Sequence, residues 1–265
     1  PRDIARIGVA VQGLAENQRG IVTWSPAFGS HDIPIAHPLT QAFGIPVAIG
    51  NDANMIAEAL IGNGAPRHGT NIVIFIGHGV GMGLIIDGAV FHGDTGAAAE
   101  FGHMNHLPRG ALCRCGRRGC IEAYAADYGI LRMANGGASN EPPHATAIPD
   151  QVLRNIETAA RAGNPHASAA FAAAGEALGY GIARLIAVLN PSRIVIAGIG
   201  TRAMPLLAPS LHQAIADGVV EELRRGILID IIPLETDLII QGTIAQALRT
   251  LDRDVFAPGV METGR

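Results

Sequence analysis

The chain has 265 residues, of which 48% are hydrophobic and 4% aromatic, and its formal net charge at pH 7 is -4. A chain of this length buries one large core or two small ones, and its charge argues against direct binding to nucleic acid or anionic lipid. All 19 basic residues are Arg, which excludes a phosphate-binding loop that needs a Lys. The 34 glycines favour an α/β fold with many tight turns.

No apolar run approaches the roughly 20 residues that span a bilayer, and the first residues lack the pattern of a signal peptide. We therefore expect a cytoplasmic protein with no membrane partner. Its three cysteines lie within eight positions of one another, and an odd number cannot all pair as disulfides. A bound metal is the better explanation.

The first part of the chain indicates a sheet. Residues 4–11 alternate as in a strand, and 20–24 are expected to form its hairpin partner across a polar turn. A short buried strand over 47–49 then brings Asn51 and Asp52 to its carboxyl end, a common place for site residues. Shorter helices are expected over 38–44 and 53–60.

A glycine-rich ribbon follows over residues 71–91. The apolar strand 71–76 reaches a run of alternating glycines from Gly77 to Gly83. A second strand over 84–86 turns at the Asp87-Gly88 dipeptide, which suits a type I′ turn, and returns over 89–91. We therefore predict an antiparallel ribbon.

The second half indicates helices and a β-α-β unit. Residues 135–149 break every periodicity and predict a surface loop or a hinge region. A long helix is expected from Asn164 to Leu189. Strands are then expected over 193–197 and 227–232, and helices over 205–216 and 242–251. We expect two domains, residues 1–130 with the ribbon and the cysteines, and residues 131–265.

The cysteines predict a structural zinc site. Cys113, Cys115 and Cys120 lie on a glycine-containing loop tight enough for three thiolates to converge on one tetrahedral ion. A fourth ligand must come from nearby, and we choose His103 over the alternative His106. Buried, metal-free cysteines are the simpler alternative, but the arginines and glycines around them do not fit a core strand. No Cys-x-x-Cys supports a thiol redox protein.

Four motifs follow one another along the chain: Asn51–Asn54, Gly77–Gly83, Glu100–His103 and Cys113–Glu122. In this order they resemble the ROK family of sugar kinases and sugar-responsive transcriptional repressors. The resemblance implies an actin-like ATPase (ribonuclease H-like) fold with two lobes and a zinc-bound loop. It also suggests that an N-terminal part of the usual fold precedes this chain.

The resemblance implies sugar-binding roles for Asn51, Asp52, Glu100, His103 and Glu122. In kinases of the family the residue matching Asp52 is the base that takes the proton of the attacking sugar hydroxyl. His103 would bind zinc with one ring nitrogen and the sugar with the other. Taken singly, Asp52 could only cap a helix, and Glu100 could only be a solvated helix residue.

Two glycine turns match the nucleotide-facing loops of the family. They are Gly77-His78-Gly79 in the ribbon and Gly198-x-Gly200 after the strand 193–197. Neither fits a dinucleotide-binding turn, because the first lies between strands and the second lacks a third glycine. Kinases of the family usually have Thr where this chain has His78, and the Asp-x-Gly-Gly-Thr phosphate hairpin is absent from residues 1–265.

These departures favour the repressor branch. We expect a sugar-sensing effector domain that binds a hexose, an N-acetylhexosamine or its phosphate, within a homodimer. DNA would be bound only through an N-terminal domain outside this chain. The alternative is an ATP-dependent sugar kinase that uses Mg²⁺ and has Asp52 as general base.

Overall fold

A computed structural model describes the chain over residues 4–64, 66, 68–144, 146–232 and 237–256. The chain forms two compact units, and each unit is assembled from separate segments. The first unit comprises residues 1–67, 88–98 and 237–265, and the second comprises residues 68–87 and 99–236.

The unit boundaries differ from the expected division at residue 130. The ribbon strand β6 (Thr70–Ile76) pairs in parallel with β9 (Arg193–Ala197), and these hydrogen bonds place the ribbon in the second unit. The last helix, α9 (Leu238–Phe256), packs against elements of the first unit. Pairing between distant segments therefore overrides chain order.

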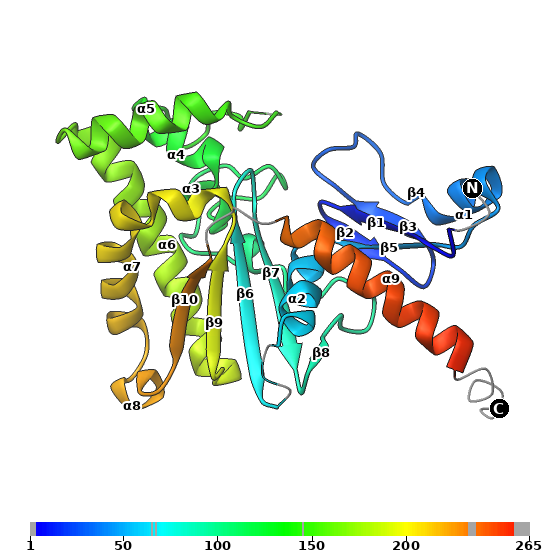
Figure 1. The fold of residues 1–265 in the computed structure, drawn as a ribbon. Coiled ribbons are helices and arrows are strands. Elements are labelled where there is room, and N and C mark those ends of the chain that lie inside the picture. Colours follow the sequence, from blue (N-terminus) through cyan, green and yellow to red (C-terminus); the bar gives the residue numbers. More distant parts are fainter. Residues whose placement is uncertain (1–3, 65, 67, 145, 233–236, 257–265) are drawn as a thin grey trace. The chain divides into compact units, whose positions relative to one another are not determined.

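The first unit contains a parallel strand pair, a small antiparallel sheet and three helices (Figure 1). Its elements are β1 (Ile7–Val11), β2 (Leu14–Glu16), β3 (Ile21–Trp24), β4 (Ile33–Pro34), α1 (Ala36–Phe43), β5 (Val47–Asn51), α2 (Asp52–Gly62), β8 (Ala89–Val90) and α9.

The predicted hairpin between residues 4–11 and 20–24 is wrong. β1 pairs in parallel with β5, whereas β3 pairs antiparallel with β2 and β4. The cause is Gly13, whose φ of 102° ends the extended conformation of β1 before β2 begins. A side chain there would collide with the carbonyl of Trp24. The hairpin therefore starts after Gly13.

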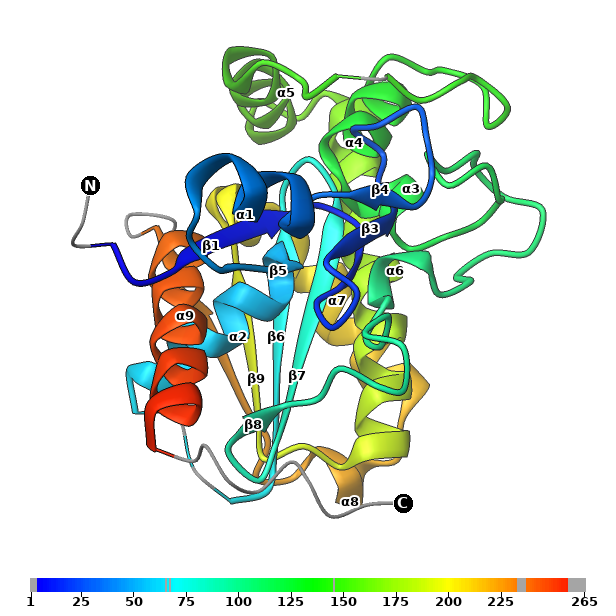
Figure 2. The same cartoon turned by 90° about the vertical axis from the view of Figure 1, so that its right-hand side faces the viewer.

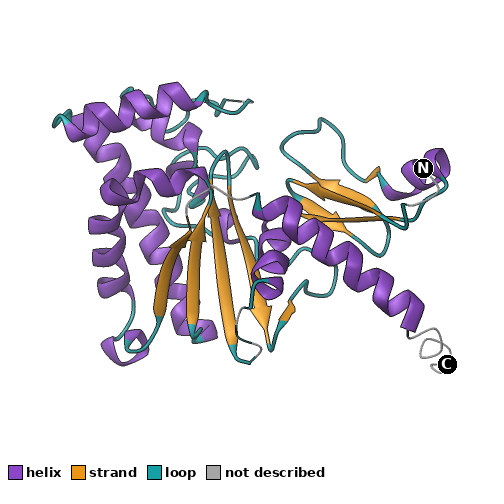
Figure 3. Cartoon of the chain, in the orientation of Figure 1, coloured by secondary structure: helices purple, strands orange, loops and turns teal. Residues whose placement is uncertain are grey.

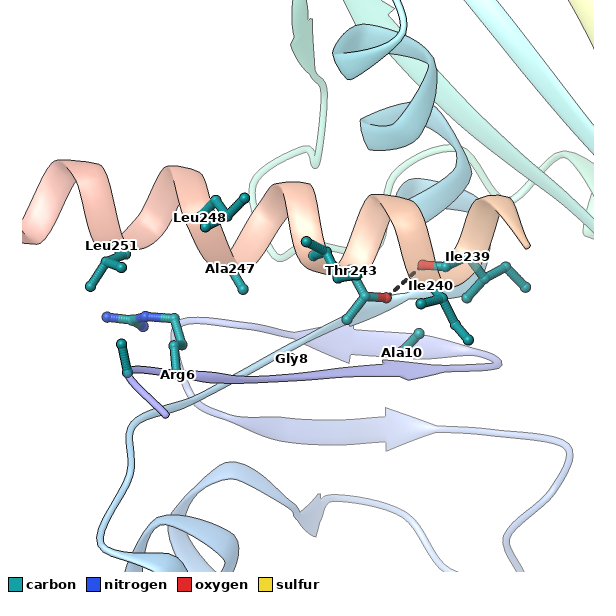
Figure 4. A pocket seen from close by; sticks show the side chains of 11 residues that line it. Arg6, Gly8, Ala10, Ile239, Ile240, Thr243, Ala247, Leu248 and Leu251 are labelled. Atoms are coloured by element: carbon teal, nitrogen blue, oxygen red, sulfur yellow. Dashed lines mark hydrogen bonds between the residues drawn. The ribbon is translucent and has the colours of Figure 1, made fainter. Parts of the chain in front are cut away.

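Helix α9 runs beside α2 and crosses β1, as Figures 1 and 2 show. It begins four residues before the predicted start at Gly242. Gly242 therefore lies inside the helix, and it is a glycine because a Cβ there would meet the backbone of Met55. A groove of about 480 Å³ lies between α9 and β1. Gly8 and Ala10 on β1, and Thr243 on α9, are among its lining residues (Figure 4).

The second unit is a sheet covered by helices (Figure 3). Within it β10, β9, β6 and β7 lie side by side in that order, with β6 and β7 antiparallel and the other pairs parallel. Its elements are β6, β7 (Val80–Ile86), η1 (Phe101–His103), α3 (Glu122–Ala125), α4 (Asp127–Ala134), α5 (Asp150–Arg161), α6 (Pro165–Leu189), β9, η2 (Ile199–Ala203), α7 (Met204–Gly218), α8 (Glu221–Arg224) and β10 (Leu228–Ile232).

The predicted ribbon turn and long helix are confirmed. Asp87 and Gly88 both have positive φ, as a type I′ turn requires. The side chain of Asn164 accepts a hydrogen bond from the backbone N–H of Ala167 and caps α6. By length and composition α6 could cross a membrane, but 56% of its most apolar window is buried inside the protein. Packing in the core, chiefly against α7, accounts for its apolar sequence.

Candidate functional site

The cysteine loop is folded back on itself by two isolated β-bridges. Asn105 pairs with Cys120 and Leu112 pairs with Arg118. Gly119, with φ of 80°, makes this possible, because a Cβ at that position would overlap the carbonyl of Leu107. Gly119 is therefore needed to bring the thiols together.

The predicted metal ligands converge at one point in the second unit. The ligand atoms of His103, Cys113, Cys115 and Cys120 all lie within 4.8 Å of one another. The Sγ atoms of Cys115 and Cys120 are 3.7 Å apart, and Sγ of Cys113 is 3.7 Å from Nδ1 of His103. A tetrahedral ion with Zn–S bonds of about 2.3 Å separates its sulfurs by about 3.8 Å. The donor set and its spacing therefore fit a tetrahedral metal ion.

The protonation states of His103 and Cys113 depend on each other and on their neighbours. A hydrogen bond with Cys120, together with burial, raises the pKa of the Cys113 thiol to about 12. Burial alone would lower the pKa of His103, but Cys113, Glu122 and Glu100 raise it overall. A metal ion that binds here must therefore displace protons from the site, which makes its affinity fall as the pH is lowered.

The alternative ligand, His106, lies apart from this cluster. Its ring is stacked on Tyr180 at 6.1 Å between centroids and meets Tyr124 edge-on at 5.3 Å. Burial is the main cause of the lowered pKa of His106. The structure therefore brings His103, and not His106, to the three cysteines.

Two predicted sugar-binding carboxylates border the metal cluster. Oε2 of Glu100 is 3.7 Å from Nε2 of His103, which leaves Nδ1 facing the cysteines. Glu100 directly precedes η1 and is half-buried, so it is not a solvated residue within a helix. Glu122 begins α3 and is buried, and its Oε2 accepts a hydrogen bond from the backbone N–H of Val80 at 3.2 Å.

Asn51 and Asp52 lie in the first unit, at the junction of β5 and α2. The cap of α2 is Asn51, whose Oδ1 accepts a hydrogen bond from the N–H of Asn54 at 3.1 Å. Its Nδ2 donates to the carbonyl of Gly13 at 2.9 Å. The alternative explanation of Asp52 as the helix cap is therefore wrong, since Asn51 holds that position.

The two glycine turns differ in what surrounds them. Gly198 has φ of 104°, and a side chain at Gly198 or Gly200 would collide with Ile76, so tight packing inside the unit explains both glycines. Gly77 and Gly79 flank His78 at the end of the ribbon, and Gly77 N–H donates to Gly79 C=O at 2.9 Å.

The sequence did not single out three residues that connect the cluster to the ribbon. Nδ1 of His78 is 2.8 Å from Oδ2 of Asp127. Arg114, between two metal-ligand candidates, donates to the carbonyl of His78 at 2.5 Å. The hydroxyl of Tyr128 donates to Oε1 of Glu122 at 3.2 Å. Of these three, only Arg114 could have been found from the sequence, because a charged residue between two cysteines is conspicuous.

These features define an α/β protein with the actin-like ATPase fold of sugar kinases and a cluster of one histidine and three cysteines that could hold a metal ion. The family model described as "ROK family" matches residues 1–237. The chain belongs to the ROK family.

Its relatives include both kinases and repressors. The chain is 32% identical over 218 residues to a glucokinase of Halalkalibacterium halodurans, and the alignment covers 80% of this chain and 66% of that protein. It is 26% identical over 254 residues to a xylose repressor of Caldicellulosiruptor bescii, covering 94% of this chain and 63% of that protein. The chain thus spans slightly less than two thirds of the length of each relative.

Solved structures show the same division. A ROK family glucokinase from Streptomyces griseus, in complex with glucose and AMPPNP, has a TM-score of 0.76 at 28% identity, over 93% of this chain and 82% of that one. A ROK family transcriptional regulator, a homologue of the Escherichia coli MLC protein, has a TM-score of 0.72 at 27% identity, over 90% and 61% respectively. The fold is therefore shared by both branches of the family.

Proposed function

We propose that this chain is the sugar-binding effector domain of a ROK transcriptional regulator. One observation carries the choice over a kinase. The ribbon turn, where kinases of the family have a hydroxyl residue, holds His78 hydrogen-bonded to the buried carboxylate of Asp127. A hydroxyl can donate to a transferring phosphoryl group, whereas Nδ1 of this imidazole is taken by the Asp127 carboxylate. The repressor relative also aligns with more of this chain than the glucokinase does.

The metal that we propose is a structural zinc held by His103, Cys113, Cys115 and Cys120. Zinc prefers this donor set in four-coordinate sites that stabilise a loop. Elemental analysis of protein purified without chelators is expected to give one zinc per chain. A metal content near zero would contradict the site.

We propose a sugar as the ligand of the carboxylates beside the zinc. Glu100, Glu122 and Nε2 of His103 offer acceptors and a donor of the kind that bind ring hydroxyls in pairs. The candidate ligands are a hexose, an N-acetylhexosamine and their phosphates. The sugar-binding roles of Asn51 and Asp52, the homodimer, and DNA binding through a segment outside residues 1–265 stay predictions from the family resemblance. The cytoplasmic location stays a prediction from the sequence.

The alternative is an ATP-dependent sugar kinase with Asp52 as general base, and it is favoured by the identity of 32% to a glucokinase. The test compares the longest natural form of the protein with its Asp52→Asn variant. Both are incubated with Mg-ATP and a sugar panel, while calorimetry measures sugar binding without ATP. We expect sugar binding with no steady ADP release. Sustained ADP formation that Asp52→Asn abolishes would establish the kinase instead.

A further inference from the structure

Asp127 holds the turn between β6 and β7 through hydrogen bonds to His78 and Gly77. It is the first residue of α4, and its side chain is only 1% exposed. Oδ2 accepts hydrogen bonds from Nδ1 of His78 at 2.8 Å and from the backbone N–H of Ile148 at 2.9 Å. The N–H of Asp127 in turn donates to the carbonyl of Gly77 at 3.1 Å. A buried carboxylate needs such partners, so backbone and side chain of the turn are held together.

Arg114 holds the same turn from the cysteine loop. Its side chain is 10% exposed and lies over the ring of Tyr128, 4.4 Å from the centroid. The guanidinium donates to the carbonyl of His78 at 2.5 Å, of His144 at 3.0 Å and of Thr146 at 3.3 Å. A planar fork with five N–H groups can serve three carbonyls at once, which a lysine cannot do.

Arg114 stands between Cys113 and Cys115, and both neighbours are ligands of the metal site proposed above. A metal ion that orders these two residues also fixes the direction in which the Arg114 side chain leaves the loop. Without the ion Cys113 and Cys115 lose their bonds to a common centre, and the Arg114 guanidinium that serves the three carbonyls is held less firmly.

We propose that Arg114 and Asp127 couple the metal loop to the ribbon turn, so that metal occupancy sets the position of His78. Arg114 and Asp127 are positioning residues in this proposal, which rests on the proposed metal site but not on the choice between regulator and kinase. The ring of His78 is 52% exposed. Because Nδ1 is taken by Asp127, the coupling decides where Nε2 is presented to a ligand.

The test is hydrogen–deuterium exchange of the metal-loaded and chelator-treated protein. Wild type is compared with Arg114→Gln and with Arg117→Gln, which removes the same charge from an exposed side chain of the same loop. Exchange at residues 77–80 is expressed relative to α6, whose buried core reports on the global fold. Metal content of each variant is measured separately.

We expect Arg114→Gln to keep its metal but to exchange at residues 77–80 at least tenfold faster than wild type. Chelation of wild type should produce a similar increase, and chelation of Arg114→Gln should add less than twofold, because both changes remove the same constraint. Arg117→Gln should behave as wild type does. If Arg114→Gln does not fold, Arg114→Lys and Asp127→Asn are compared in the same way.

Three outcomes would overturn the proposal. A chelated wild type whose residues 113–120 open while 77–80 keep their protection would show that the turn is independent of the metal loop. Equal, additive effects of chelation and Arg114→Gln would show the same. Wild type that contains no metal would instead remove the metal site itself, and with it the coupling.

Discussion

The hydroxyl of Tyr128 lies 3.2 Å from Oε1 of Glu122 and connects a predicted sugar-binding carboxylate to the protein core. Both side chains are buried. Burial strongly raises the pKa of Tyr128, so the phenol stays protonated and donates to the carboxylate. Together with the N–H of Val80, which donates to Oε2, the phenol holds Glu122 in place, so the carboxylate keeps one anchor if the phenol is removed.

Replacing Glu122 by Gln should weaken sugar binding. A hydrogen bond to a charged acceptor contributes about 1.5–3 kcal/mol, so the loss of the charge is expected to lower affinity roughly tenfold or more. Calorimetric titration with the sugar measures this. Tyr128→Phe is the control, because it removes a partner of Glu122 and leaves the carboxylate in place. It should lower the melting temperature and change affinity less than twofold. Equal loss of affinity in both variants would mean that Glu122 acts only through structure.

Comparing His103→Ala with His106→Ala should show which of the two histidines binds the proposed metal ion. His103→Ala removes the imidazole that faces Cys113, so bound metal should fall to less than half and the melting temperature should drop. His106→Ala removes only packing against two tyrosines and should keep one metal per chain. Metal content by elemental analysis decides between them. A His106→Ala protein that loses its metal would reinstate the alternative ligand.

Arg202→Gln should destabilise the second unit. The guanidinium contacts both carboxylate oxygens of Glu157 at 2.7 to 3.2 Å and Oδ1 of Asp150 at 2.6 Å. Glu157 is buried, and Arg202 is the cation that the described residues place beside it, so Arg202→Gln removes that partner. Since Arg202 is partly exposed, we expect a loss of about 2 kcal/mol, below the roughly 3–5 kcal/mol of a fully buried pair. Arg154→Gln, at an exposed partner of Asp150, should cost much less in the same urea titration.

Acid should weaken the same network through Asp150. Hydrogen bonds from Arg202 and then from Arg154 lower the pKa of Asp150. A carboxyl whose pKa is lower in the folded state contributes stability above its unfolded pKa, and this contribution is lost as the pH falls through the folded value. The loss is therefore expected below about pH 4. Asp150→Asn should flatten the dependence of melting temperature on pH in that range, and an unchanged slope would contradict this assignment.

The sequence predicted the convergence of His103 with the three cysteines because these residues are close in the chain. Cys113, Cys115 and Cys120 share one loop, and the glycines that shape it are visible in the pattern. The pairing of residues 20–24 was missed, since one glycine with positive φ decides it. Asp127 and Arg114 were missed for another reason: both contact His78, which lies 49 and 36 residues away from them respectively, and no local pattern reveals such a contact.

Gly242→Ala tests how closely α9 packs on α2. Alanine normally stabilises a helix by about 1 kcal/mol relative to glycine. At Gly242 the added Cβ would overlap the backbone of Met55, which cannot move without displacing α2. We therefore expect the opposite sign, a loss of about 3 kcal/mol or more, which exceeds the usual 1–3 kcal/mol of overpacking because backbone must shift. Gly62→Ala, in the last turn of α2 with open space around it, is the matched control and should be neutral or slightly stabilising. Urea titrations of both variants give the two free energies of unfolding. A Gly242→Ala protein as stable as wild type would show that α9 does not approach α2 so closely.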